Sequence, residues 1–197
     1  GGIHLRTCGH GWIAKFPQAD DPVDMGRVEY ASNKLQIECG IDAVDCDIKT
    51  IPSGHVFLTR RFDRIGAARL HCISAQTMML AQDASLQDLY SYPLLADGLR
   101  TADARDAKNG CRELFRRMVF NALMDNTDDH EKNHSLVLQE GQWNLSKSYD
   151  ALPRLTGLGA QAMSIGSAGT TVDMANILSA HSRFLLGEME ARSICRE

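Results

Sequence analysis

The chain has 197 residues, of which 44% are hydrophobic and 23% charged, and its formal net charge is −4 at pH 7. This length allows one domain, or two lobes of one fold, with a substantial core, while the acidic balance argues against nucleic acid or an anionic membrane as a direct partner. No stretch approaches about 18 consecutive apolar residues, the N-terminus lacks a signal-peptide pattern and the six cysteines form no C-x-x-C pair. We therefore expect a cytoplasmic protein with reduced thiols and no membrane span.

The first part of the chain predicts a strand followed by a helix. Residues 11–16 have strand character, and Lys15 lies within their apolar run, where its ammonium group must reach solvent or meet an anion. Residues 26–39 predict a helix, because apolar side chains recur there at helical spacing and a glycine follows. We expect Glu29 and Glu38 to lie on this helix as solvated charges.

The next part of the chain changes from strands to helices. Residues 44–51 and 54–62 predict two strands joined by a Pro-Ser-Gly turn. The sequence after Gly66 favours helices, with a short one over 74–80 that the serine hydroxyl can cap. Another is predicted over 93–99, since proline suits the first helical turn.

The strongest helical pattern covers residues 106–125, where six apolar side chains form one broad stripe that predicts a core-facing helix. These are Leu114, Phe115, Met118, Val119, Ala122 and Leu123. Residues 135–138 and 143–145 flank a Glu-Gly pair and predict a β-hairpin. Two short helices, broken near Gly187, are expected after residue 171.

Between that helix and the hairpin lies the polar segment 126–134, N-T-D-D-H-E-K-N-H, which we call the polar loop. Its His130-Glu131-x-x-His134 matches the H-E-x-x-H signature of zinc proteases. That site needs both histidines on one face of a helix and a third ligand. Asn, Thr and Asp residues at the start of the loop favour caps and turns instead, so we rank a zinc metalloprotease as a remote alternative.

The preferred interpretation of the polar loop is phosphoryl transfer. That chemistry requires a carboxylate to orient the attacking hydroxyl, an amide and a second carboxylate to bind magnesium, and a lysine for the nucleotide phosphates. Asp128, Asn133, Asp150 and Lys15 supply this set in the order found in protein kinases: strand lysine, D-x-x-x-x-N loop, hairpin and magnesium aspartate.

Six blocks in order resemble the HipA-like kinases, the toxin half of bacterial toxin–antitoxin pairs, over nearly the whole chain. They are W-I-A-K-F-P (12–17), R-R-F-D-R (60–64), R-L-H-C-I-S-A (69–75), E-L-F-R-R-M-V-F-N-A-L (113–123), the polar loop (126–134) and S-Y-D-A-L-P (148–153).

The resemblance implies a role for each matching residue. Lys15 would contact the ATP phosphates, and Asp128 would be the catalytic base. Asn133 and Asp150 would bind magnesium, and His130 would shape the loop without binding metal.

The same resemblance assigns Arg60, Arg61 and Phe62 to the linker against the adenine. One feature departs from the family. The glycine-rich phosphate loop of the family should lie just before Trp12, but residues 1–11 do not match it, and Gly9-His10-Gly11 resembles a simple strand turn. We therefore expect a domain that is incomplete at both ends and that, as written, binds nucleotide weakly and transfers phosphate slowly or not at all.

Together these inferences predict an α+β, bilobal protein-kinase-like fold, with a small strand-rich lobe over 1–63 and a helical catalytic lobe over 64–197. ATP and Mg2+ would bind between the lobes, and the γ-phosphoryl group would pass to a serine or threonine of a protein. The resemblance suggests an aminoacyl-tRNA synthetase as substrate and a helix-turn-helix antitoxin as inhibitory partner, with DNA contacted only through the antitoxin. The alternative from another class is a catalytically silent kinase-like module within an antitoxin complex.

Overall fold

The computed structural model describes residues 3–7, 10–82, 90–102, 106–154, 157 and 159–197. Internal contacts group the chain into two units, the first formed by Gly1–His71 with Lys147–Leu152 and the second by Cys72–Ser146 with Pro153–Glu197. The predicted lobe boundary at residue 63 stays a prediction. It placed Asp150 with the helical part, whereas these contacts group Asp150 with the first unit.

The first unit contains a four-stranded antiparallel sheet in the order β1-β2-β4-β3. Its strands are β1 (Ile3–Thr7), β2 (His10–Lys15), β3 (Cys46–Ile51) and β4 (Gly54–Arg60). The last three confirm predicted strands, while β1 was not predicted. Of the expected turn before Trp12, Gly9 lies outside the described residues.

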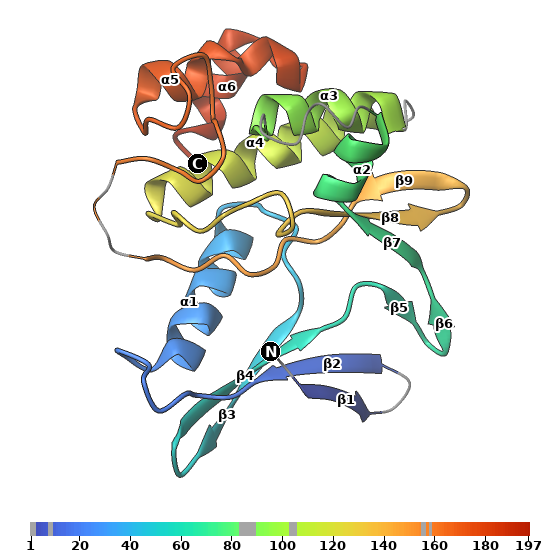
Figure 1. Ribbon diagram of the computed structural model, residues 1–197, viewed down its shortest axis with the longest axis vertical. Helices are drawn as coiled ribbons and strands as arrows, with labels where there is room; N and C mark the ends of the chain where they lie inside the picture. Colours follow the sequence, from blue (N-terminus) through green and yellow to red (C-terminus); the bar gives the residue numbers. More distant parts are fainter. Residues whose placement is uncertain (1–2, 8–9, 83–89, 103–105, 155–156, 158) are drawn as a thin grey trace. The chain divides into compact units, whose positions relative to one another are not determined.

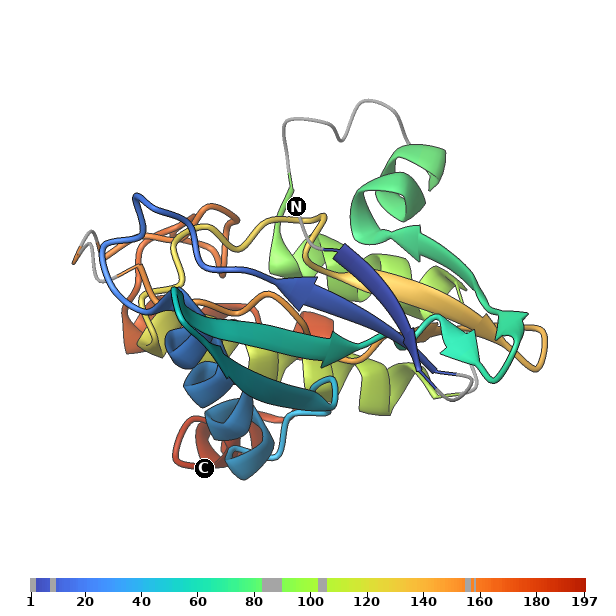
Figure 2. The same cartoon turned by 90° about the horizontal axis from the view of Figure 1, so that it is seen from below.

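Helix α1 (Met25–Glu38) packs on this sheet (Figure 2). Gly26 permits the close approach, because a Cβ atom there would lie 2.3 Å from the carbonyl oxygen of His55 on β4. The apolar positions that predicted the helix are not its buried face: Leu35 and Ile37 are 38% and 45% exposed. Polar side chains are buried instead, at the i, i+3, i+4, i+7 spacing of one helical face. They are Glu29, Ser32, Asn33 and Gln36.

Short strands follow where the sequence favoured helix. They are β5 (Arg64–Ile65), β6 (Ala68–Arg69) and β7 (His71–Ser74). The helical expectation is wrong for residues 68–73, because β6 pairs with β5 and β7 joins β8 (Ser135–Gln139) and β9 (Gln142–Leu145) in a three-stranded sheet. Ser74 caps the next helix as predicted, since its hydroxyl accepts from the Thr77 amide at 3.1 Å. Pairing across more than 60 residues leaves no trace in local periodicity. The predicted β8–β9 hairpin is confirmed, with φ of 51° at Glu140 and 78° at Gly141.

The second unit is otherwise helical (Figure 1). Its helices are α2 (Ala75–Gln82), α3 (Tyr92–Ala102), α4 (Ala107–Leu123), α5 (Met174–Ser179), the 3-10 turn η2 (His181–Phe184) and α6 (Glu188–Ile194). The stripe on α4 forms the core as predicted, except that the terminal Leu123 is 65% exposed. Phe115 on α4 meets Phe184 edge to face, with ring centroids 5.2 Å apart. Among the described residues, no helix is long and apolar enough to cross a membrane.

Candidate functional site

The first unit brings together Lys15, Glu29 and Asp150. Lys15 ends β2, Glu29 lies one turn into α1, and Asp150 comes from Lys147–Leu152, which we call the strap. The Lys15 ammonium donates to Oε1 of Glu29 and, at 2.5 Å, to Oδ1 of Asp150. The lysine that the sequence placed in an apolar run therefore meets two anions.

Glu29 is a correction to the sequence analysis, since its side chain is 8% exposed and is not a solvated charge. Burial raises the pKa of Glu29 above its ordinary 4.5, and the Lys15 charge opposes that shift. Burial lowers the pKa of Lys15, but the charges of Glu29 and Asp150 raise it by more, so its pKa lies above the ordinary 10.5. Lys15 is therefore a fixed cation at neutral pH, shared by a buried carboxylate and a half-exposed one.

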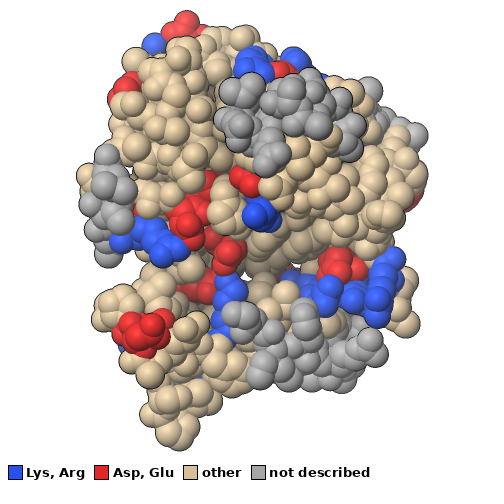
Figure 3. Space-filling model, in the orientation of Figure 1, with Lys and Arg blue, Asp and Glu red and all other residues tan. Residues whose placement is uncertain are grey.

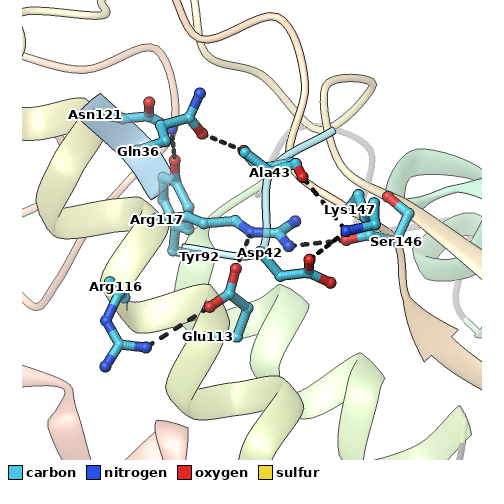
Figure 4. Close-up of polar contacts among 11 residues, drawn as sticks. Gln36, Asp42, Ala43, Tyr92, Glu113, Arg116, Arg117, Asn121, Ser146 and Lys147 are labelled. Atoms are coloured by element: carbon cyan, nitrogen blue, oxygen red, sulfur yellow. Dashed lines mark hydrogen bonds and ion pairs between the residues drawn. The ribbon is translucent and has the colours of Figure 1, made fainter. Parts of the chain in front are cut away.

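The strap is anchored by the two residues that precede Tyr149 and Asp150. Ser148 pairs with the segment before β3: the Val44 amide donates to the Ser148 carbonyl at 3.0 Å, and the Ser148 amide donates to the Asp42 carbonyl at 2.8 Å. The Lys147 ammonium reaches Asp42 at 2.5 Å and lies 3.4 Å from the Ala43 carbonyl (Figure 4). Asp150 itself has φ of 61°, a left-handed conformation that residues other than glycine seldom adopt. Such backbone geometry persists where neighbours hold it, and it concentrates at functional sites.

Ser146, the residue just before the strap, belongs to the second unit and is held there by a buried side chain. The guanidinium of Arg117, 2% exposed, donates to the Ser146 carbonyl at 2.8 Å and to Glu113 at 2.9 Å (Figure 4). Arg117 thus anchors the residue that precedes the strap to helix α4.

The polar loop presents Asp128 and Asn133 in the second unit. The Asp128 side chain is 59% exposed and forms an ion pair with Arg154, which is also exposed. The Asn133 amide nitrogen lies 3.5 Å from the Asp128 carbonyl, so the five-residue offset does return the chain on itself. On the face drawn in Figure 3, basic side chains (blue) lie beside acidic ones (red).

A buried hydrogen-bond network supports the polar loop. The Tyr92 hydroxyl donates to Asp129, which also lies 3.0 Å from Nε2 of His134. The Asn121 amide donates to the Tyr92 hydroxyl at 2.9 Å, and the Asn126 amide donates to Asn121 at 3.1 Å. Burial raises the pKa of Tyr92 well above 10, and the Asp129 charge adds to the shift, so Tyr92 remains a neutral donor.

This network excludes the helical geometry that a zinc protease requires. Residues 126–134 contain turns but no helix, and His134 is 3% exposed and directed to Asp129. His130 is partly buried, and its Nδ1 has no hydrogen-bond partner. Within the described part of the chain, no group of three or more His, Cys, Asp or Glu side chains is placed to bind a metal.

The predicted adenine linker lies at the end of β4 and just beyond it. Arg60 pairs with Asp45 at 3.2 Å, and Arg61 pairs with Asp63 at 2.5 Å. Phe62 stacks on Tyr149 of the strap, with ring centroids 5.4 Å apart and planes inclined by 25°. Both rings belong to the first unit, so this contact is another anchor of the strap next to Asp150.

Sequence reasoning named Lys15 and Asp150, which the structure joins, and Asp128 and Asn133, which lie together in the other unit; their roles stay predictions. It missed Glu29 and the network centred on Tyr92. Two signals were available: the polar stripe at helical spacing on α1, and the requirement that Lys15 meet an anion.

Comparison with known proteins places this architecture in a family. The HipA-like C-terminal domain matches residues 4–197, nearly the whole chain. The chain belongs to the HipA-like C-terminal domain family. No curated protein matches it.

Solved structures that share the fold include two bacterial proteins. HipA of Shewanella oneidensis MR-1, from a complex with HipB and operator DNA, has a TM-score of 0.75 at 17% identity, covering 93% of this chain. The proinflammatory kinase CtkA of Helicobacter pylori has a TM-score of 0.69 at 11% identity, covering 98% of this chain and 81% of its own. The chain spans about half of that HipA, 48%. These likenesses confirm the predicted α+β, kinase-like fold.

Proposed function

We propose that this chain is the catalytic domain of a HipA-type serine/threonine protein kinase that uses ATP and Mg2+. The observation that supports this most strongly is the bridge from Glu29 through Lys15 to Asp150. In protein kinases, a strand lysine paired with a helix glutamate and a magnesium-binding aspartate must both be in place for activity. The D-x-x-x-x-N spacing of Asp128 and Asn133 completes the set.

The donor set fits magnesium. Mg2+ prefers oxygen ligands and is usually held by one or two carboxylates together with substrate phosphates. Asp150 offers a half-exposed carboxylate, and Asn133 offers an amide oxygen, since its amide nitrogen is the end that faces the Asp128 carbonyl. When bound, the ion would neutralise phosphate charge; Lys15 would hold the phosphates beside it.

In the proposed reaction, a serine or threonine hydroxyl oxygen forms a bond to the γ-phosphorus of ATP while the bond to the β–γ bridging oxygen breaks. ADP leaves, and the hydroxyl proton passes to the Asp128 carboxylate. The Arg154 ion pair does not prevent this role, because exposed pairs contribute only about 0–1 kcal/mol. His130 would shape the loop, and Arg60, Arg61 and Phe62 would border the adenine.

The family suggests the biological setting. HipA of Shewanella oneidensis was solved with HipB and operator DNA, which supports an antitoxin as partner and DNA contact through that antitoxin. We further propose a cytoplasmic toxin of a toxin–antitoxin pair, related to persistence, with an aminoacyl-tRNA synthetase as substrate.

Thermal unfolding tests the nucleotide site. A ligand that binds only the folded state at 100 times its Kd stabilises by about 2.7 kcal/mol, which corresponds to a Tm increase of about 5–11 °C for a chain of this size. We expect this increase with ATP and Mg2+ together and not with Zn2+. Stabilisation by Zn2+ alone, with stoichiometric zinc by elemental analysis, would refute the assignment.

Phosphate transfer is tested with γ-labelled ATP and a panel of aminoacyl-tRNA synthetases, with Asp128→Asn as the control. Labelled phosphate on serine or threonine residues of a synthetase, present with the wild type and absent with Asp128→Asn, would support the kinase assignment. Binding of nucleotide without transfer to any protein, both by this chain and by any longer form of the protein, would favour the silent kinase-like module.

A further inference from the structure

The buried face of α1 is polar because its side chains bind the strap. The Ser32 hydroxyl donates to the Ala151 carbonyl at 2.6 Å, and the Ser148 hydroxyl donates to Oε1 of Gln36 at 2.5 Å. All four residues are nearly inaccessible to solvent, with Ser32 at 3% and Gln36 at 2% exposed. Three of the four buried polar positions of α1 therefore serve the strap, since Glu29 reaches Asp150 through Lys15.

These contacts bracket Asp150 on both sides. One hydrogen bond is made two residues before it and the other immediately after it, while its own backbone is in the left-handed region. Leaving a buried hydrogen-bonding group without its partner costs about 1–3 kcal/mol, so each of these bonds favours the observed position of the strap. The backbone bonds of Ser148 to Asp42 and Val44 keep the strap docked, and the helix side chains fix its orientation around Asp150.

We propose that Ser32 and Gln36 are positioning residues that hold the Asp150 carboxylate for Mg2+. This inference rests on the proposed function, because it concerns the same metal-binding carboxylate. Residues that orient a metal ligand without touching the metal commonly change metal affinity by about 10–100-fold when replaced. Helix α1 would thus set magnesium affinity through hydrogen bonds as well as through the Glu29 ion pair.

The test measures the Mg2+ concentration that gives half of the thermal stabilisation by a non-hydrolysable ATP analogue. We expect Ser32→Ala and Gln36→Leu each to raise this concentration at least tenfold, and Ser32→Thr, which keeps the hydroxyl, to restore it. Gln36→Leu provides the result if Ser32→Ala does not fold. Asn33→Ala is the matched control: Asn33 is a buried polar neighbour on α1 that bonds to the Val44 carbonyl at 3.1 Å and to the Cys46 thiol at 3.0 Å. The Asn33→Ala variant should change the magnesium requirement less than twofold.

A double-mutant comparison separates positioning from general loss of structure. In an Asp150→Asn background, Ser32→Ala and Gln36→Leu should cause no further change in the magnesium requirement. The inference would be overturned if Ser32→Ala and Gln36→Leu changed the magnesium requirement no more than Asn33→Ala does. It would also be overturned if their effect persisted in the Asp150→Asn background. A wild-type chain that binds the analogue without any magnesium dependence would instead refute the proposed function.

Discussion

The pairing of Lys15 with the buried Glu29 can be measured as a coupling free energy in a double-mutant cycle. The cycle consists of Lys15→Met, Glu29→Gln and the double variant, and the first unit supplies a control pair of the same chemistry. That control is Lys147 with Asp42, which lie 2.5 Å apart but are 40% and 64% exposed. In the test pair, Glu29 is only 8% exposed.

Burial decides the expected difference between the two pairs. Two charges 4 Å apart interact by about 1 kcal/mol in water and by about 4 kcal/mol at an effective dielectric constant of 20. Lys15 keeps Asp150 when Glu29 is replaced, which reduces the loss. We therefore expect a coupling of about 1.5–3 kcal/mol, the range of hydrogen bonds to charged groups, against about 0.2–1 kcal/mol for the control pair.

Urea denaturation at pH 7 supplies the free energies of unfolding. Trp12 lies in the first unit and Trp143 in the second, so a Trp143→Phe background makes fluorescence report the unit that contains both pairs. If the free energy of unfolding falls by about 2 kcal/mol per molar urea, a coupling of about 2 kcal/mol corresponds to a shift of about 1 M urea in the unfolding midpoints of the cycle. Equal couplings for the two pairs would refute the argument that burial strengthens the Lys15–Glu29 interaction.

The stability that Lys15 contributes depends on pH, and the sign of this dependence follows from its raised pKa. A cation whose pKa is higher in the folded state contributes stability that is present below its unfolded pKa, near 10.5, and lost as pH rises through the higher folded value. The free energy of unfolding should therefore fall less steeply above pH 10.5 in Lys15→Met than in the wild type. Identical slopes in urea titrations across that range would contradict the shift.

Further predictions concern the two acidic groups, the loop support and the thiols. In an active, full-length form, Asp128→Asn should abolish phosphate transfer and leave nucleotide affinity within about twofold. Asp150→Asn should also weaken magnesium-dependent binding by tenfold or more, as calorimetry would show. Tyr92→Phe removes a hydroxyl that donates to the buried Asp129 and accepts from Asn121, and it should lower the free energy of unfolding by about 1–3 kcal/mol in a urea titration. Burial raises the pKa of Cys111 to about 11, so at pH 8 iodoacetamide should label the exposed Cys72 in the folded chain and Cys111 only after unfolding, as read by mass spectrometry.

Elements whose core faces are apolar were predictable from the sequence. The stripe on α4 and the Glu140-Gly141 turn of the β8–β9 hairpin both follow from local rules, because helical periodicity and positive φ are properties of neighbouring residues. The D-x-x-x-x-N spacing likewise survives in the structure, since both residues lie in one loop. These features depend on few distant contacts.

The face of α1 was not predictable by the same rule. Hydrophobic periodicity assumes that burial is apolar, whereas Ser32 and Gln36 are buried against a strap more than 100 residues away in the sequence. The strands β5 to β7 were missed for a related reason, because their partners are short or distant. A polar stripe at helical spacing, next to a strand lysine in need of an anion, was the available sign of α1's true orientation.

The grouping of Asp150 with Lys15 also bears on how the proposed activities can be separated. The first unit contains Lys15, Glu29 and Asp150, to which we assign binding of the phosphates and of Mg2+ in the proposed function. The polar loop is stabilised instead by Tyr92, Asp129 and other buried groups of the second unit. In the proposed function, phosphate binding and hydroxyl activation would therefore depend on different hydrogen-bond networks. The chain passes from one unit to the other on each side of the strap. Substitutions in the α1 network should act on nucleotide and metal affinity without changing the base, whereas substitutions beneath the polar loop should act on the transfer step through Asp128 and on metal affinity through Asn133.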